Sequence, residues 1–276
     1  MGRLRRGVGR GPERLIDVGA ERALESAGAA VTSEVIELDW DFNDRSGSGE
    51  DDASFELMRL VSERVAAARA DGAFPVILSG SCLAAVGIVA GLGEHSPGVV
   101  WLDAHADFNT PETTVSGYLD GMGLAMLIGD AWQTMVGMIP GARPVAETAA
   151  LLVGARDFDE PERRRVADSD VELVEAAKLR SPAPLLEAID RLEPAPSGIY
   201  LHVDLDVLDA EAANVNVYSA PGGISADELE ALVAAVLDHG TVRALSLTAY
   251  DPDRDTERRV PPIAMRLLEA LAQRAG

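Results

Sequence analysis

The sequence predicts an α/β protein in which a mostly parallel sheet lies between two layers of helices. Apolar, β-rich runs alternate with longer amphipathic segments along most of the chain. Several of the runs are apolar at nearly every position, as is typical of strands covered on both faces. Strand–helix alternation of this kind favours a parallel sheet with helices on both sides. Because no repeat or low-complexity tract interrupts the pattern, we expect one domain over residues 1–276.

The expected elements follow from the spacing of apolar residues, which is continuous in the strands and helical in the segments between them. Ser225, followed three residues later by Glu228, predicts a capping box at the start of one helix. In chain order we expect a helix over Pro12–Ala27, a strand over Val35–Leu38, a helix over Phe55–Ala70, a strand over Phe74–Leu78, a helix over Leu83–Gly91, strands over Val99–Leu102 and Ala150–Val153, a helix over Leu185–Leu192, a strand over Ile199–Val203, a helix over Ala226–His239, a strand over Val242–Leu247 and a helix over Pro261–Arg274.

The composition excludes several classes of partner. A formal net charge of −22 repels nucleic acid and anionic lipid. No apolar run approaches the roughly 20 residues that a membrane-spanning helix needs, and the basic N-terminus leads into no apolar signal segment. The single cysteine, Cys82, cannot form an intramolecular disulfide. We therefore expect a cytoplasmic protein that binds neither nucleic acid nor membranes.

Polar side chains gather where three of the predicted strands end, which is where ligands bind in α/β sheets. Asp103, His105 and Asp107 follow one strand, Asp204 and Asp206 follow another, and Cys82 follows a third. In an extended segment, residues two apart point to the same face, so these groups are expected to converge. Such carboxylates repel unless a cation lies among them, and carboxylates with one imidazole suit Mn²⁺ or Mg²⁺. The number of ligands predicts two ions.

Each of these features also has an ordinary structural interpretation. An Asp-x-Asp pair after a strand is often part of a turn or a helix N-cap, and a lone cysteine such as Cys82 is often a small buried apolar residue. Burying two carboxylates and an imidazole without a cation is costly, which favours the metal interpretation for Asp103–Asp107. The histidines His95, His202 and His239 have no comparable context, and we interpret them as structural or exposed.

Four segments, in the right order, closely resemble motifs of the arginase (ureohydrolase) family. Asp103–Gly121 resembles the metal-and-substrate loop of that family, and His202–Asp209 followed by Pro221–Gly223 resembles its second metal motif. Arg6–Pro12 and Gly154–Asp159 resemble its N-terminal and middle signatures. The resemblance implies a three-layer α/β/α sandwich with two Mn²⁺ ions per subunit at the strand ends. The metal ligands that it implies are Cys82, Asp103, His105, Asp107, Asp204 and Asp206.

The resemblance also implies a substrate class. Arginases hold the amino-acid end of arginine through residues that match Asn109, Ser116, Asp159 and Glu162. Agmatine, which lacks the carboxylate, would not require that set. We therefore expect a small-molecule guanidino amino acid as the substrate.

Several positions depart from the family pattern. Cys82 stands where the family has a histidine ligand, and a thiolate is a softer ligand than imidazole. Asp120 stands at the position of the proton-shuttling histidine, and Ala249 at that of the glutamate that steadies the guanidinium. The cysteine together with the lost glutamate resembles the Nω-hydroxy-L-arginine hydrolase branch, which serves antibiotic biosynthesis. Hydroxylation makes a guanidine less basic, so such a substrate has less need of the missing glutamate.

The leading hypothesis is hydrolysis of a guanidino C–N bond by a hydroxide that two Mn²⁺ ions generate. Asp107 would accept a hydrogen bond from the hydroxide and pass its proton to the departing amine, with Asp120 as a second catalytic candidate. The products would be ornithine and hydroxyurea, or ornithine and urea. The alternatives are a hydrolase of another guanidino or amide substrate and a non-catalytic descendant that keeps the metal. Many family members form trimers or hexamers, so a homo-oligomer is compatible with the resemblance.

Overall fold

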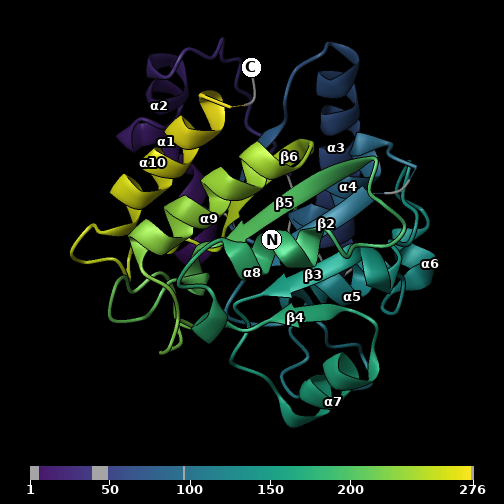
Figure 1. Cartoon of the computed structure of the whole chain (residues 1–276). Helices are drawn as coiled ribbons and strands as arrows, with labels where there is room; N and C mark the ends of the chain where they lie inside the picture. Colours follow the sequence, from purple (N-terminus) through teal and green to yellow (C-terminus); the bar gives the residue numbers. More distant parts are fainter. Residues whose placement is uncertain (1–5, 39–48, 96, 275–276) are drawn as a thin grey trace.

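The computed structural model describes residues 6–38, 49–95 and 97–274 (Figure 1). Its centre is a parallel sheet in the strand order β1-β6-β5-β2-β3-β4. The strands are β1 (Val76–Ser79), β2 (Pro97–Leu102), β3 (Ala150–Val153), β4 (Glu172–Val174), β5 (Gly198–Asp204) and β6 (Val242–Thr248). The predicted fold class is confirmed.

The strand order changes direction between β2 and β5, which lie side by side in the sheet. From β2 the chain continues to β3 and β4 on one side, whereas β5 is followed by β6 on the other side. Loops that leave two neighbouring strands in opposite directions open a crevice at their carboxyl ends, where α/β proteins bind ligands. The loops after β2 and β5 are those that carry the predicted metal ligands.

Helices cover both faces of the sheet (Figure 1). Side chains alternate along β2: Val100 and Leu102 belong to one buried cluster, and Val99 and Trp101 to the other. The first cluster includes residues of α1 (Gly11–Val18), α2 (Ala20–Ser26), α8 (Ala183–Ile189), α9 (Ala226–His239) and α10 (Val260–Ala272). The second includes residues of α3 (Glu50–Ala70), α4 (Ala84–Leu92), α5 (Gly123–Ile128) and α7 (Glu160–Asp168). The result is a three-layer sandwich.

Short elements complete the chain. They are the 3₁₀ turns η1 (Gly7–Arg10), η2 (Leu119–Met122), η3 (Glu147–Ala149), η4 (Ala176–Lys178) and η5 (Leu205–Val207), and the one-turn helix α6 (Gln133–Val136). The capping box predicted for α9 is confirmed, because the Glu228 amide donates to Ser225 Oγ and the Ser225 amide donates to Glu228 Oε2. Among the described residues, no helix combines the length and apolar character needed to cross a membrane.

Two of the expected elements are wrong. Val35–Leu38 is not a strand: Val35 is 70% exposed, and Ile36 instead packs against the cluster that contains α3 and α4. This segment therefore does not pair with the sheet. The helix expected over Pro12–Ala27 is two helices, because Gly19 adopts φ 118°, a left-handed conformation that ends α1. The elements β4, α5 and α7 are not among those that the sequence predicted.

Candidate metal centre

Strand register brings the predicted ligands together at one edge of the sheet. Thr248, at the end of β6, is level with Ser79 of β1 on one side and Asp204 of β5 on the other. Leu102 of β2 is level with Val203 of β5, so Asp103 begins its loop beside Asp204. Cys82 lies in the turn between β1 and α4. Residues far apart in the sequence are thus neighbours across adjacent strands.

The loop after β2 reaches the cluster by turning rather than by remaining extended. The backbone bends at Ala104 and His105, and Asp107 has a φ of 50°, in the left-handed region that non-glycine residues rarely adopt. The Asp107 carbonyl accepts hydrogen bonds from the amides of Leu124 and Ala125 at 3.0 and 3.1 Å, at the start of α5. The expectation of a fully extended segment is therefore wrong, and the turn is held by α5.

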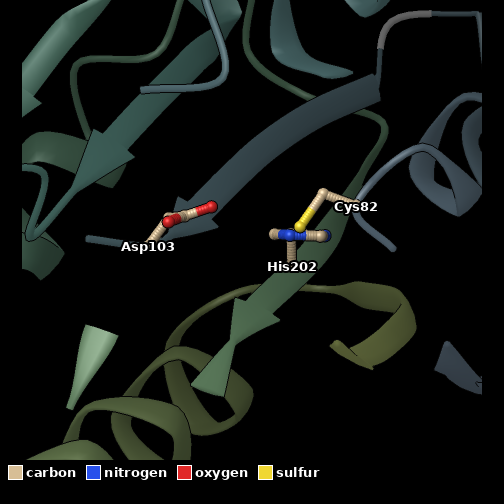
Figure 2. Close-up of side chains that lie close together, drawn as sticks. All are labelled: Cys82, Asp103 and His202. Atoms are coloured by element: carbon tan, nitrogen blue, oxygen red, sulfur yellow. The ribbon is translucent and has the colours of Figure 1, made fainter. Parts of the chain in front are cut away.

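Two groups of side chains each bring three ligand atoms within 4.8 Å of one another. The first group is Asp103, His105 and Asp206, in which His105 Nδ1 lies 3.3 Å from Asp103 Oδ1 and 3.4 Å from Asp206 Oδ2. The second is Cys82, Asp103 and His202 (Figure 2). Asp103 belongs to both groups, which is the arrangement expected of a carboxylate shared between two ions.

The remaining predicted ligands are buried beside these groups. Asp204 accepts a hydrogen bond from the Cys82 thiol, with Sγ and Oδ2 3.0 Å apart. Asp107 is 7% exposed and lies close enough for the charges of Asp103 and Asp120 to raise its pKa. All six predicted ligands therefore lie in one region of the structure.

The electrostatics of this region match the donor set of a cation site. Burial and then the charge of Asp206 raise the pKa of Asp103 to about 7. Burial and the charges of neighbouring carboxylates also raise the pKa values of Asp107, Asp204 and the Cys82 thiol. Like charges gathered out of water favour protonation, and a bound divalent cation reverses that preference. The residues present therefore fit a carboxylate-rich centre for divalent metal.

His105 and Asp206 form the one strongly ionised pair in the first group. Burial lowers the pKa of His105, but hydrogen bonds to Asp103 and Asp206 outweigh it and hold that pKa above its usual value. Burial alone would raise the pKa of Asp206; the His105 contact and the Asn216 side chain lower it to about 2. Without metal, these shifts favour an ion pair between His105 and the carboxylates, and a bound cation would take over that compensation.

His202, which the sequence indicated as structural or exposed, is buried and also lies beside two of the predicted ligands. It is fully buried, stacks on Trp101 with ring centroids 3.7 Å apart, and lies with Cys82 and Asp103 (Figure 2). Its Nδ1 is 2.9 Å from the Tyr200 hydroxyl, and burial lowers its pKa to about 3, so it is neutral. The available signal was its position two residues before Asp204, on the same face of β5.

Supporting residues that the sequence did not indicate hold the carboxylates in place. Trp101 Nε1 donates to Asp103 Oδ2 at 3.1 Å, and Asn216 Nδ2 donates to Asp206 Oδ2 at 3.0 Å. Backbone amides at His105 and Asp206 donate to Asp103 and Asp204. Each aspartate thus keeps an orientation set by a second contact, as ligating carboxylates do in metal sites.

The residues predicted to bind the amino-acid end of a substrate differ in their surroundings. Asn109 is buried, and its side-chain oxygen accepts a hydrogen bond from Thr113. Ser116 is exposed on the same loop. Asp159 immediately precedes α7 and, half-buried, makes no side-chain cap of that helix. Glu162 is 4% exposed and accepts a hydrogen bond from the Phe108 amide at 2.9 Å, so it also fixes the loop that carries Asp107.

Asp120 and Ala249, two positions that depart from the family pattern, lie close to this region. The Ser81 hydroxyl and the Leu83 amide donate to Asp120 Oδ1, which attaches η2 to the turn that carries Cys82. Ala249 follows β6 with a φ of 60°, and its carbonyl accepts a hydrogen bond from Asn216. Its methyl group offers no charge to a guanidinium.

Comparisons with known proteins identify the family of this chain. The family model described as "Arginase family" matches residues 1–272. The chain is 29% identical over 288 residues to the arginase of Bacillus subtilis (strain 168), covering 98% of this chain and 94% of that protein. It is 32% identical over 196 residues to the N(omega)-hydroxy-L-arginine amidinohydrolase of Streptomyces lavendulae, covering 70% and 66%. A crystal structure of the Bacillus subtilis arginase superposes with a TM-score of 0.87 at 26% identity, covering 97% of this chain and 93% of that one. The chain belongs to the arginase family of ureohydrolases, enzymes that hydrolyse C–N bonds.

Proposed function

We propose that this enzyme hydrolyses the guanidino C–N bond of Nω-hydroxy-L-arginine, giving ornithine and hydroxyurea, with two Mn²⁺ ions bound at the candidate metal centre. The observation that carries the proposal is the pairing of a cysteine with the loss of a carboxylate: Cys82 contacts Asp204 within the cluster, and Ala249 follows β6 where arginases have a glutamate. The relative from Streptomyces lavendulae, named as an amidinohydrolase of this substrate, supports the same choice.

The chemical reason is the lower basicity of an N-hydroxyguanidine. A fully cationic guanidinium buried near the cluster gains from an anionic partner, and Ala249 supplies none. A less cationic group has less need of that partner and is more easily attacked at carbon. The substitution therefore favours the hydroxylated substrate over the parent amino acid.

The proposed roles of the chain's residues follow from their contacts. Divalent ions held by Asp103, His105, Asp107, Asp204, Asp206 and Cys82 would supply hydroxide near neutral pH by lowering the pKa of water. Asp107 is buried beside the other proposed ligands, so its carboxylate would accept a hydrogen bond from the hydroxide and pass the proton to the departing amine. Asp120, fixed by Ser81, is the second candidate for this transfer. Asn109, Ser116, Asp159 and Glu162 are proposed to bind the α-amino and α-carboxylate groups.

L-Arginine is the second candidate substrate. The relatives named as arginases cover nearly the whole chain, including the Bacillus subtilis enzyme. The residues proposed to bind the amino-acid end serve either substrate equally, since the two differ only at the guanidino group. Discrimination between them therefore depends on Cys82, Ala249 and the groups around the guanidine.

The setting of the enzyme is part of the proposal. Hydroxyurea as a product fits a role in antibiotic biosynthesis, as the resemblance to the hydroxyarginine branch implies. The single cysteine of the sequence and its acidic composition support a cytoplasmic location and a small-molecule partner rather than nucleic acid or membrane. We propose a single domain over residues 1–276 that assembles as a homo-oligomer.

The test compares product formation from three substrates by Mn²⁺-loaded protein. The three substrates are supplied at equal concentrations. The products measured are ornithine from Nω-hydroxy-L-arginine and from L-arginine, and putrescine from agmatine. We expect hydroxyarginine to react fastest and agmatine slowest. A Cys82→His variant, which restores an imidazole ligand, is expected to raise the rate with arginine relative to hydroxyarginine. No turnover of any of the three substrates would exclude the proposed activity.

A further inference from the structure

Two tyrosines border the metal centre but have no role in the chemistry proposed above. Tyr118 directly precedes η2, and Tyr218 lies in the loop between η5 and α9. Their rings are stacked, with centroids 6.2 Å apart and an interplanar angle of 28°. The ring of Tyr218 lies nearly perpendicular to that of His105, with centroids 6.1 Å apart. This tyrosine pair therefore adjoins the cluster itself.

Both members of the tyrosine pair are held by residues of the site. The Tyr118 amide donates to Ser116 Oγ at 3.1 Å, and the Tyr218 amide donates to Asn216 Oδ1 at 2.8 Å. Ser116 is proposed to bind the amino-acid end of the substrate, whereas Asn216 contacts Asp206 in the metal centre. The pair thus joins a loop that carries a proposed substrate-binding residue to a loop that contacts the metal centre.

The exposure of these two rings is typical of a ligand-binding surface. Tyr118 is 43% exposed and Tyr218 54%. Among the described residues, the large exposed apolar side chains are Val35, Val115, Tyr118, Met138, Val217 and Tyr218, and all but Val35 and Met138 lie in these two loops. An exposed apolar patch that adjoins a buried polar cluster is typical of a ligand-binding surface.

The hydroxyl of Tyr118 remains neutral at this position. Burial and then the charge of Asp120 raise its pKa above the ordinary value. The pair therefore offers aromatic ring faces beside an acidic cluster. Aromatic faces bind methylene groups and flat, delocalised guanidine-type groups, with or without a full positive charge.

We propose that the tyrosine pair is the subsite for the side chain of the substrate, in which the ring faces contact its methylene chain and planar guanidino group. The inference rests on the proposed function and deepens it, because it assigns the contact that Ala249 cannot make. A carboxylate favours only the cation, whereas an aromatic face also binds a less basic N-hydroxyguanidine. Tyr118 and Tyr218 are in this view specificity-determining residues that act on substrate binding.

Steady-state kinetics of single variants test the subsite. Tyr118→Ala and Tyr218→Ala are each expected to raise KM for Nω-hydroxy-L-arginine about 3- to 10-fold, with kcat changed less than about 2-fold, because each removes one ring contact. Tyr118→Phe and Tyr218→Phe keep the ring face and are expected to stay within about 2-fold of the original enzyme. Met138→Ala, at an exposed apolar residue outside the two loops, is the matched control and is expected to leave both constants unchanged.

A binding measurement separates this inference from the proposed activity. Where the Mn²⁺-loaded protein does not cleave the compound, calorimetric titration with Nω-hydroxy-L-arginine or L-arginine gives Kd; where it does, KM is the readout. If the protein binds these compounds but cleaves none of the three substrates, the activity is excluded, and a weaker Kd in the alanine variants still supports the subsite.

The same titration defines what would overturn the subsite. Unchanged Kd and KM in both alanine variants would overturn it, and failure of the original protein to bind any guanidino amino acid would overturn both proposals. Tyr218→Leu keeps an apolar side chain of substantial volume but removes the aromatic face. It therefore separates loss of the ring contact from a folding defect caused by the smaller alanine. If Tyr218→Leu binds as tightly as the original protein, the aromatic faces make no contribution and the inference is wrong.

Discussion

Replacing Asn216 by alanine tests how strongly the metal centre depends on contacts outside its ligands. Asn216 is 3% exposed and makes three hydrogen bonds: its amide nitrogen donates to Asp206 Oδ2 and to the Ala249 carbonyl, both at 3.0 Å, and its oxygen accepts from the Tyr218 amide at 2.8 Å. The bond to Asp206 is charge-assisted, and buried bonds of these kinds contribute about 0.5–3 kcal/mol each. Removing all three is therefore expected to lower the free energy of unfolding by about 2–4 kcal/mol.

Metal affinity is the more specific readout of Asn216→Ala. Contacts that orient a ligating carboxylate typically change metal affinity about 10- to 100-fold, so we expect Mn²⁺ to bind that much more weakly. The assay is competition for Mn²⁺ against a chelator of known affinity, followed with thermal denaturation of the same samples. Asn214→Ala is the matched control, because Asn214 is exposed two residues earlier in the same loop. If the two variants retain the same Mn²⁺ affinity, the role assigned to Asn216 is refuted.

Three further predictions concern stability. The raised pKa of Asp103, about 7 against an ordinary 3.8, means that the folded metal-free protein keeps a proton that the unfolded chain releases. The Tm measured in chelator should therefore fall as pH rises from about 4 to 7, and a rise over that window would contradict the electrostatics described here. In Gly87→Ala, the new methyl carbon would lie 2.3 Å from the Met58 carbonyl oxygen, where α3 packs on α4. The free energy of unfolding measured in urea should therefore fall by about 3 kcal/mol. An unchanged unfolding midpoint would show that the two helices move apart at no cost in stability. Arg156→Lys should lower the unfolding free energy by about 2–4 kcal/mol, because the guanidinium donates to the carbonyl oxygens of Gly154, Asp206, Leu208, Ala220 and Pro221. Retained stability in that variant would mean that water replaces the lost donors.

The sheet and the position of the site could be predicted because both depend on local patterns. Continuous apolar runs such as Val99–Leu102 identify strands buried on both faces, and parallel strands place their carboxyl ends at one edge. Asp103 and Asp204 come directly after two such runs, so their proximity followed from the fold class alone. The neighbouring register of β2 and β5 confirms that proximity.

The failures have a common physical origin in tertiary contacts. The Val35–Leu38 segment has a strand-like pattern, but Ile36 packs against the buried cluster that contains α3 and α4 without joining the sheet, and no short-range signal distinguishes the two outcomes. His202 lies inside an apolar strand, and its position beneath Cys82 depends on how β1 and β5 flank β6. The tyrosine pair joins two loops that are about 100 residues apart in sequence. Such contacts require the assembled fold.

The sequence also did not predict the backbone conformation of Asp107 at the site. Asp107 adopts a positive φ that its sequence pattern does not predict, and contacts of its carbonyl with the start of α5 and of the Phe108 amide with Glu162 hold the turn. Residues that hold unusual conformations are concentrated at functional sites, because surrounding contacts must stabilise them. The departure from an extended loop is thus consistent with the location of Asp107 in the cluster.

The central claim is that side chains at the carboxyl ends of β1, β2 and β5 enclose a pair of divalent ions. The most direct measurement is the metal content of protein that has been stripped with chelator, reloaded with Mn²⁺ and freed of excess metal. The account predicts two Mn²⁺ ions per chain, with a higher Tm than the stripped protein, and loss of at least one ion in Asp103→Ala. A reloaded protein that retains no Mn²⁺ and melts at the same temperature as the stripped sample would contradict it.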